Sequence, residues 1–192
     1  MPTVSELYLG RRTYRRFKQD PMPEALAAQI LENCRTASSA RNGQTLKFYA
    51  VLSPEKVAVM NTLVKFAGAL PPELGTPKEG EKPVAFIVIV KTKPEDAWAD
   101  IDAGIATDMI TMTAWESGFG SCVMGAINVG EIGKLLDLDP SEKVRLAIAL
   151  GKPDHKSTLV EVPESGSLSY YVDENVDYYV PKKAFDQVCF IV

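Results

Sequence analysis

The stretch from Ile101 to about Gly118 limits the possible folds of this chain more than any other, because as a helix it is apolar on nearly every side. One face carries Ile101, Ile105, Met109 and Met112 at helical spacing. The remaining faces carry Ala103, Ala106, Ile110, Ala114 and Trp115. Such a helix leaves no face suited to water. We therefore expect it either at the centre of a core or in a dimer interface.

Helices and strands are mixed around this segment. Apolar periodicity predicts helices over residues 24–37, 54–64 and 131–136. Strands are predicted over residues 48–52, 122–124 and 144–150. The unbroken apolar run at 84–90 fits a strand buried on both faces. Residues 70–83 contain four prolines and two glycines, which indicates a flexible rim or lid. The mixture places the chain in the α+β class.

The composition is that of one globular domain with room for a small appended arm. The chain has 192 residues, of which 46% are hydrophobic and 24% are charged. No stretch reaches ~18 uninterrupted apolar residues, so we expect no membrane span. The first residues lack the basic-then-apolar pattern of a secretory signal. We therefore expect a cytoplasmic protein.

Cysteine and histidine usage argues against disulfide and metal chemistry. Cys34, Cys122 and Cys189 are odd in number, widely spaced and form no CxxC pair. The single histidine, His155, lies in a polar loop and is interpreted as a surface residue. We therefore expect no metal site, and a Ser-His-Asp triad would have to rest on His155 alone.

Five basic residues crowd into the first 18 positions of a chain whose net charge is −4. They are Arg11, Arg12, Arg15, Arg16 and Lys18. A guanidinium group presents a planar fork of donors that matches phosphate, and it stays charged at any relevant pH. The run predicts a bound anion, and the alternative is a solvated helix end. Nucleic acid is disfavoured because binding along its backbone needs a broad positive face. The chain has neither GxGxxG nor GxxxxGK[ST], so a Rossmann or P-loop site is not indicated.

Three further stretches carry polar or small residues suited to a ligand. Residues 37–44 offer hydroxyl, amide and guanidinium groups that suit the polar edge of a flat ring, although such loops are also common turns. The glycines of residues 118–127 allow a backbone to approach a ring closely, and the alternative is a simple turn. Lys182 and Lys183 could return positive charge to the Arg cluster, or could start an exposed helix.

The region from Glu161 to Pro181 has a different character. It contains five acidic residues, neither Lys nor Arg, and the tyrosines Tyr170, Tyr171, Tyr178 and Tyr179. It has little periodicity of its own. We divide the chain into a ligand-binding domain over residues 1–165 and an extended arm over 166–192 that packs on a partner subunit. The alternative is a floppy tail, which the tyrosines and the apolar ending disfavour.

Taken in order, these stretches resemble the FMN-dependent nitroreductase family in its shorter branch, over nearly the whole chain. The family opening Arg-Arg-Ser-x-Arg-x-Phe is similar to residues 11–17, and its Pro-Ser-x-x-Asn-x-Gln loop to residues 38–44. Its Gly-x-Gly-Ser-Cys helix end resembles residues 118–122, and its Val-Pro-Lys-Arg motif resembles residues 180–183. Thr13 stands in place of Ser, Ser38 in place of Pro, and Lys183 in place of Arg. Thr45 and Leu46 stand where Pro-Trp often occurs.

The resemblance implies a central, mostly antiparallel sheet flanked by helices, in an intertwined homodimer whose C-terminal arms are exchanged. It implies that FMN is held by Arg11, Arg12, Thr13, Arg15, Ser38, Ser39, Arg41, Asn42, Gly125, Ala126, Lys182 and Lys183. Arg11, Thr13, Arg15 and Lys183 would hold the phosphate, with Lys182 as a further candidate. Ser38 and Ser39 would come from the partner subunit. The backbone of Gly125 and Ala126 would lie near the flavin N5.

The implied activity is an FMN-dependent NAD(P)H oxidoreductase. Hydride would pass through flavin N5 in a ping-pong scheme to a nitroaromatic, a quinone or an activated alkene, with no protein acid or base required. Arg12, or alternatively Arg41, would stabilise the reduced flavin. Two alternatives remain open: a flavin-binding protein without efficient turnover, such as a storage, regulatory or flavin-modifying protein, and an anion-binding or nucleic-acid-binding domain that uses the Arg run alone.

Overall fold

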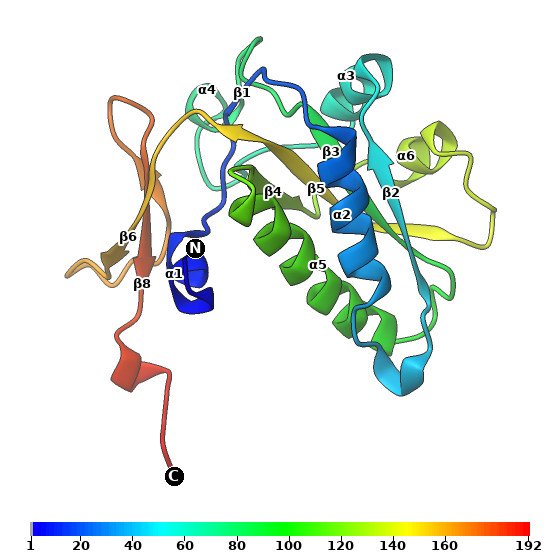
Figure 1. Cartoon of the computed structure of the whole chain (residues 1–192). Coiled ribbons are helices and arrows are strands. Elements are labelled where there is room, and N and C mark those ends of the chain that lie inside the picture. Colours follow the sequence, from blue (N-terminus) through cyan, green and yellow to red (C-terminus); the bar gives the residue numbers. More distant parts are fainter. Residues whose placement is uncertain (1) are drawn as a thin grey trace.

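The centre of the molecule is the strand β3 (Ala85–Lys91), in a computed structural model that describes residues 2–192 (Figure 1). Every residue of β3 is buried, as the unbroken apolar run predicts. β3 pairs antiparallel with β2 (Leu46–Val51) on one side and with β5 (Lys143–Pro153) on the other. β5 also pairs antiparallel with β4 (Gly120–Met124) and, at its C-terminal end, with the short β1 (Phe17–Lys18).

Helices cover both faces of this sheet. The helices α2 (Glu24–Arg35) and α5 (Trp98–Glu116) pack on one face, and α3 (Pro54–Thr62) and α6 (Val129–Leu135) pack on the other (Figure 1). Alternate residues of β3 point to opposite faces. Ile87 and Ile89 therefore join the core under α2 and α5, whereas Phe86 and Val88 join the core under α3 and α6. The α+β class and the antiparallel sheet are confirmed.

The long apolar helix α5 is buried on only one of its faces. Ala106, Ile110 and Ala114 are fully buried against the sheet and α2. Trp98 and Ile101 are 52% and 55% exposed on the opposite side. The helix ends as predicted, because Gly118 adopts φ 78°, a conformation that favours glycine. The expectation of a core helix thus holds for one face, and the second apolar face stays exposed in the single chain.

The region after β5 contains strands that the sequence did not predict. β6 (Ser157–Glu161) pairs in parallel with β8 (Tyr178–Lys182), and β7 (Tyr171–Val172) pairs antiparallel with β8. These strands are short and lack a clear alternation, so the sequence pattern did not show them. Beyond β8 the tail, with its short helix η2 (Phe185–Gln187), extends away from the body of the molecule (Figure 1).

Two short helices complete the fold, α1 (Val4–Gly10) at the N-terminus and α4 (Pro72–Gly75) within the proline-rich loop. Both are short, and neither was predicted. Within residues 2–192, no helix is long and apolar enough to cross a membrane.

A pair of glycines seats the basic N-terminal segment on the sheet. Gly120 of β4 and Gly151 of β5 are partners in the ladder. A Cβ at Gly120 would lie 2.6 Å from Cδ2 of Tyr14, and a Cβ at Gly151 would lie 2.8 Å from Cβ of Phe17. Tyr14 and Phe17 are buried against these two positions. The absence of side chains at the glycines therefore determines where residues 11–17 lie.

We expect Gly120→Ala to destabilise the protein by about 1–3 kcal/mol, because the added methyl group collides with the Tyr14 ring. Gly133→Ala, on α6, is the matched control, since its Cβ would meet only Leu138 Cδ1 at 3.9 Å. That control should be neutral or stabilising by up to about 1 kcal/mol, from helix propensity alone. Urea unfolding of both variants measures the difference. Equal stability of the two variants would contradict this account of how the segment is seated.

Candidate anion and cofactor site

Basic side chains from both ends of the chain meet in one cleft of about 240 Å³, which we call the Arg cleft. Its lining residues are Arg11, Arg12, Thr13, Arg15, Thr111, Ser121, Val123, Leu159, Tyr170, Val180 and Lys182. Four of these residues are cationic, and one of the four, Lys182, is contributed by β8. The convergence of the Arg run with a C-terminal lysine, which the sequence suggested, is therefore present in a single chain.

Residues 11–17, which we call the Arg run, have an extended backbone that directs some side chains into the cleft and others into the interior. The Tyr14 N–H donates to the Ser121 carbonyl at 2.9 Å, which holds the run along the edge of β4. In an extended segment successive side chains point in opposite directions. Thr13 and Arg15 consequently line the cleft, whereas Tyr14 and Arg16 are buried.

Arg11 is held at the wall of the cleft by α5. Its Nη1 donates to Thr111 Oγ1 at 2.6 Å, and its Nη2 lies 3.1 Å from Asp108 Oδ1. The other oxygen of Asp108 accepts a hydrogen bond of 2.8 Å from the Tyr8 hydroxyl, and this bond raises the pKa of Tyr8. Arg12 donates to the Leu9 carbonyl, and partial burial lowers the pKa of its guanidinium. Asp108 thus pairs with Arg11, one of the four cations of the cleft.

Arg15 is stacked on aromatic rings of the C-terminal sheet. Its guanidinium carbon lies 4.4 Å from the centre of the Tyr170 ring and 5.0 Å from that of Tyr178. Its Nε is buried and has no hydrogen-bond partner among the residues that the structure describes. The backbone N–H of Arg15 donates to His155 Nε2 at 3.0 Å. The interpretation of His155 as a surface residue is therefore wrong: its ring is half-buried, because residues 178 and 14 pack on either side of it.

Arg16 lies outside the cleft and anchors the proline-rich loop. It pairs with Glu81, and its Nη2 donates to the Leu74 carbonyl at 2.9 Å. The Phe17 N–H also donates to the Glu81 carbonyl at 2.9 Å. The loop predicted as a flexible rim is thus attached to the Arg run at two places.

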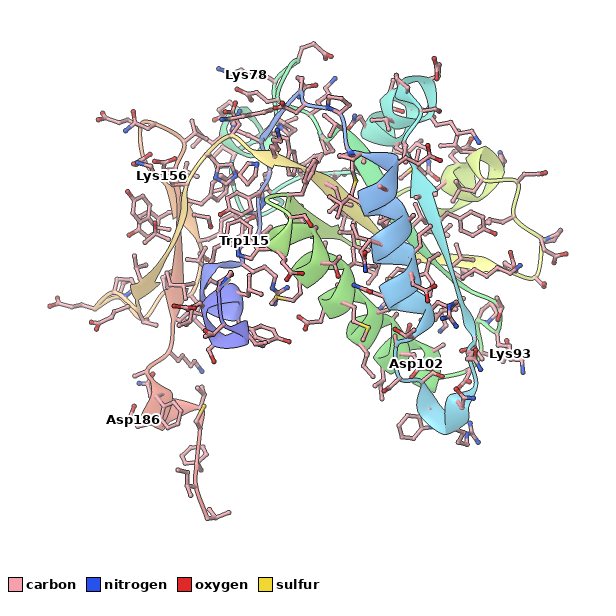
Figure 2. The ribbon with its side chains drawn as sticks, in the orientation of Figure 1. Lys78, Lys93, Asp102, Trp115, Lys156 and Asp186 are labelled. Carbon is pink, nitrogen blue, oxygen red and sulfur yellow. The ribbon has the colours of Figure 1, made fainter. Side chains whose placement is uncertain are left out.

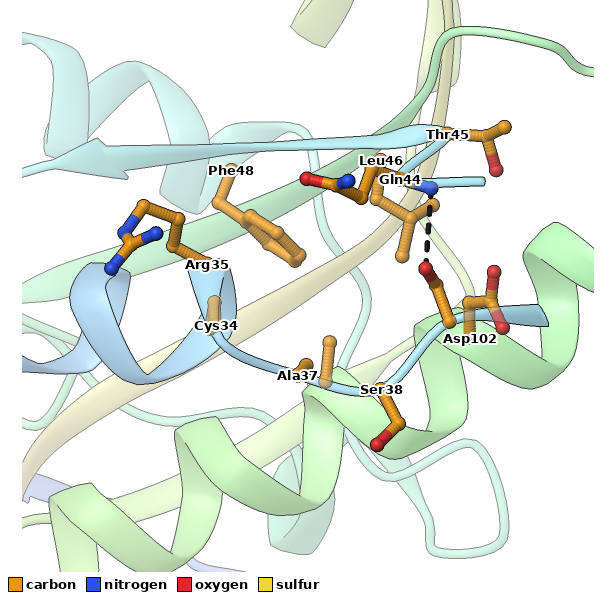
Figure 3. A pocket seen from close by; sticks show the side chains of 11 residues that line it. Cys34, Arg35, Ala37, Ser38, Gln44, Thr45, Leu46, Phe48 and Asp102 are labelled. Carbon is orange, nitrogen blue, oxygen red and sulfur yellow. Dashed lines mark hydrogen bonds between the residues drawn. The ribbon is translucent and has the colours of Figure 1, made fainter. Parts of the chain in front are cut away.

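A second pocket of about 190 Å³ lies beside residues 38–44, which we call the Ser loop (Figure 3). Its lining residues are Cys34, Arg35, Ala37, Ser38, Ser39, Gln44, Thr45, Leu46, Phe48, Asp102 and Ala106. The buried Asp102 accepts a hydrogen bond of 3.0 Å from the Ala40 N–H, at the start of the short helix η1 (Ala40–Asn42). Arg41, Asn42 and Gln44 have φ values of 54°, 53° and 48°. This loop is therefore fixed in a conformation that is costly for residues other than glycine.

The two pockets lie at opposite ends of α5. Asp102 touches the Ser loop and Thr111 touches the Arg cleft, and nine residues of α-helix separate them by ~13 Å. Figure 2 shows Asp102 at one end of the helix and Trp115, which stacks on Tyr14, at the other. A single chain therefore brings together Arg11, Arg12, Thr13, Arg15 and Lys182, but not Ser38, Ser39, Arg41 and Asn42.

The remaining predicted residues border the Arg cleft. Lys183 faces a neighbouring depression, lined also by Glu161 and Gln187, so Lys182 is the lysine that enters the cleft. Gly125 and Ala126 are exposed and follow directly after β4, whose Ser121 and Val123 line the cleft. A Cβ at Gly125 would meet nothing within 4 Å, so the surface beyond Val123 is open.

Sequence reasoning missed several residues at the Arg cleft. Thr111 and Asp108 are polar positions within an otherwise apolar helix, and that interruption was a usable signal. Ser121 lies in the Gly-x-Gly-Ser-Cys motif and Tyr170 in the C-terminal arm, and neither residue type alone predicts a place in the cleft. Among residues 2–192 there is no cluster of His, Cys, Asp and Glu that could hold a metal ion.

Comparison with solved structures shows which class of protein shares this fold. A solved FMN-dependent nitroreductase from Clostridium difficile R20291 has a TM-score of 0.66 to this chain, at 22% identity. The match covers 80% of this chain and 89% of that one. At this level of identity the likeness establishes a shared fold, which confirms the nitroreductase-like architecture.

Sequence comparison narrows the class to a family. Residues 8–152 match the model of the nitroreductase family. YfhC of Bacillus subtilis (strain 168), provisionally named an NAD(P)H nitroreductase, is 25% identical over an alignment of 164 positions, which covers 79% of this chain and 84% of that protein. The NADH dehydrogenase of Thermus thermophilus is 28% identical over an alignment of 194 positions, which covers 86% of this chain and 85% of that protein. The chain belongs to the nitroreductase family.

Proposed function

We propose that the protein is an FMN-dependent NAD(P)H oxidoreductase that reduces nitroaromatic, quinone or activated-alkene acceptors. The observation that carries this proposal is the meeting of Arg11, Arg12, Arg15 and Lys182 in one cleft within a nitroreductase fold. The names of the relatives, which include an FMN-dependent nitroreductase and NAD(P)H-linked enzymes, support the same activity.

The Arg cleft fits the phosphate of FMN in charge and in donor groups. A phosphate dianion takes several charge-assisted hydrogen bonds, each worth roughly 1.5–3 kcal/mol. Three guanidinium groups and an ammonium line the cleft, together with the hydroxyl-bearing residues Thr13 and Ser121. The buried Nε of Arg15 has no partner among residues 2–192, so the hydrogen-bonding capacity of this guanidinium is not used up within the chain.

The outward face of β4 supports a position for the flavin ring. From the Arg cleft this face continues past Val123 to the open surface at Gly125 and Ala126. A ring that lay along it would meet backbone rather than bulky side chains. When bound there, FMN supplies the hydride-accepting ring, and the chain's own contribution is to hold the phosphate and present the ring to solvent-borne substrates.

A homodimer would explain why the Ser loop lies far from the Arg cleft in one chain. Trp98 and Ile101 leave one face of α5 apolar and exposed. If two copies pack these faces about a twofold axis with their α5 helices antiparallel, the Ser loop of one copy lies near the Arg cleft of the other. Ser38 and Ser39 would then contact the flavin from the partner, and the exposed apolar tail after Lys183 would cover the other subunit.

The absorption spectrum of the purified protein, followed by anaerobic addition of NADH or NADPH, tests the proposed function. We expect an oxidised-flavin spectrum that bleaches with reductant and recovers on addition of a nitroaromatic or a quinone. A flavin spectrum that does not bleach would instead favour a flavin-binding protein without turnover. A colourless protein that cannot take up FMN would contradict both functions and leave an anion site alone.

We expect Asp108→Asn to tighten FMN binding about two- to five-fold at low salt. The variant removes the carboxylate that lies 3.1 Å from Arg11 and opposes a phosphate dianion, and surface charge pairs of this kind are worth ~0.2–1 kcal/mol. The amide still accepts the hydrogen bond from Tyr8. Flavin fluorescence quenching measures the dissociation constant.

Glu55→Gln is the matched control for this variant, because Glu55 is exposed on α3 and changes the net charge equally. Its FMN affinity should equal that of the wild type. Weaker binding by Asp108→Asn would show that the carboxylate is needed to hold Arg11 in place.

Removal of residues 184–192 tests the exchanged arm while keeping β8 and the whole Arg cleft. We expect the truncated chain to dissociate at concentrations where the full chain is dimeric, because Phe185 and Phe190 are 70% and 74% exposed in the single chain. Sedimentation velocity measures the association. A truncated protein that stays dimeric would mean that the tail does not hold the subunits together.

The alkylation rate of Cys189 gives a second test of whether a partner subunit buries the tail. Burial raises the pKa of the thiols of Cys34, to about 12, and of Cys122, so these two should resist alkylation. Cys189 is exposed in the single chain. Its alkylation should slow as the protein concentration rises through the dimerisation range, and a constant rate would argue against burial of the tail by a partner.

A further inference from the structure

The only histidine of the chain joins the two segments that supply the cations of the Arg cleft. The His155 ring lies between Tyr14 of the Arg run and Tyr178 of β8, with ring centres 5.2 Å and 4.6 Å away. Its Nε2 accepts a hydrogen bond of 3.0 Å from the Arg15 N–H, and its Nδ1 lies 2.8 Å from the Lys156 carbonyl oxygen. The same carbonyl accepts from the Tyr178 N–H at 2.9 Å.

These contacts specify one form of the ring. A backbone N–H can only donate, so Nε2 must keep its lone pair, and a carbonyl can only accept, so Nδ1 must carry the hydrogen. His155 is therefore the neutral Nδ1–H tautomer. A protonated ring would place an Nε2–H against the Arg15 N–H, two donors facing each other with no acceptor between them.

The surrounding groups mostly favour the neutral ring. Burial lowers the pKa of His155, and the charges of Arg15 and Arg16 act in the same direction. The hydrogen bond to the Lys156 carbonyl acts in the opposite direction, as does the charge of Asp177, which accepts from the Lys156 N–H at 2.7 Å. The neighbouring phenols of Tyr14 and Tyr178 are held neutral, since burial raises the pKa of both.

Arg15 connects this arrangement to the cleft. Its backbone is bonded to His155, and its guanidinium is stacked on Tyr170 and Tyr178, which belong to the same C-terminal region as Lys182. A shift of the Arg15 backbone would thus move the guanidinium group and change its packing against Tyr170 and Tyr178. The position of Arg15 relative to Lys182 therefore depends on the His155 ring, which lies between the segments that carry them.

We propose that His155 is a positioning residue of the Arg cleft: its neutral ring fixes the Arg15 backbone so that Arg15 and Lys182 face one phosphate group, and its protonation loosens the cleft. The inference rests on the proposed FMN site for the identity of the ligand. The direction in which pH changes the cleft follows from the lowered pKa of His155. The contribution of the neutral ring is complete above about pH 6.5 and is lost as pH falls through the lower pKa of the folded protein.

The test compares the pH dependence of FMN binding between pH 8 and 5 in the wild type, His155→Gln and His155→Phe. Glutamine can accept from the Arg15 N–H and donate to the carbonyl, but it does not titrate. FMN gains a second phosphate proton near pH ~6, which weakens binding in every variant. We expect the wild type to lose about ten-fold more affinity than His155→Gln on acidification.

At pH 8 we expect His155→Gln to bind within about three-fold of the wild type and His155→Phe to bind about ten-fold more weakly. Parallel pH profiles for the wild type and His155→Gln would overturn the inference, as would wild-type affinity in His155→Phe. The NMR signal of the single imidazole in the wild type provides an independent measurement, which does not depend on whether His155→Phe folds.

In the wild type the Arg15 amide signal should shift with the same midpoint as the imidazole. Saturating FMN should lower that midpoint, since a ligand weakened by protonation must in turn oppose protonation. A midpoint raised by FMN would contradict the inference, because a nearby phosphate dianion acting only through space raises it. If FMN does not bind at pH 8, the proposed function fails, and the same titrations with inorganic phosphate then decide the role of His155.

Discussion

The docking of two aromatic side chains onto two glycines positions the arginine-bearing segment of the Arg cleft. Tyr14 and Phe17 occupy the space left free by Gly120 and Gly151, which are partners in the β4–β5 ladder. With these two rings fixed, the extended backbone directs Thr13 and Arg15 outward and Arg16 inward. The outward pair faces the cleft, and the inward guanidinium anchors the proline-rich loop through Glu81. These two packing contacts thus organise both the arginines of the proposed phosphate site and the loop beside it.

The helix α5 relates the cleft to the rest of the molecule. Its buried alanines and Ile110 fill the core, while three of its polar residues hold segments of the proposed site. Thr111 and Asp108 fix Arg11 at one end, and Asp102 fixes the strained Ser loop at the other. The ~13 Å between these ends is a property of helix geometry and cannot be removed by side-chain movement. This separation, together with the exposed Trp98 and Ile101, is the physical basis for proposing a site shared between two subunits.

The sequence predicted those parts of the fold in which burial and periodicity are strong. The apolar run of β3, the Ser53-capped α3 and the end of α5 at Gly118 all lie close to the expected positions. β6, β7 and β8 were missed, because strands of two to five residues that pack on one side carry no regular pattern. The cluster of Arg11, Arg12 and Arg15 was predictable from charge density, whereas Thr13 was predicted only through the family resemblance. The role of His155 was not, since its burial depends on aromatic partners more than 20 and 140 residues away in the chain.

The Arg cleft requires contacts between residues very distant in sequence, and this has a consequence for the order of events during synthesis. Lys182 is made 167 residues after Arg15, and β8 is held by pairing with β6 and β7. Contacts of such long range form late, because the loop entropy must be lost before they contribute. During synthesis, Arg11, Arg12 and Arg15 therefore have no complete anion site until β8, which carries Lys182, has been made. The anion would then bind after the chain has folded, and it would not guide the folding of the site.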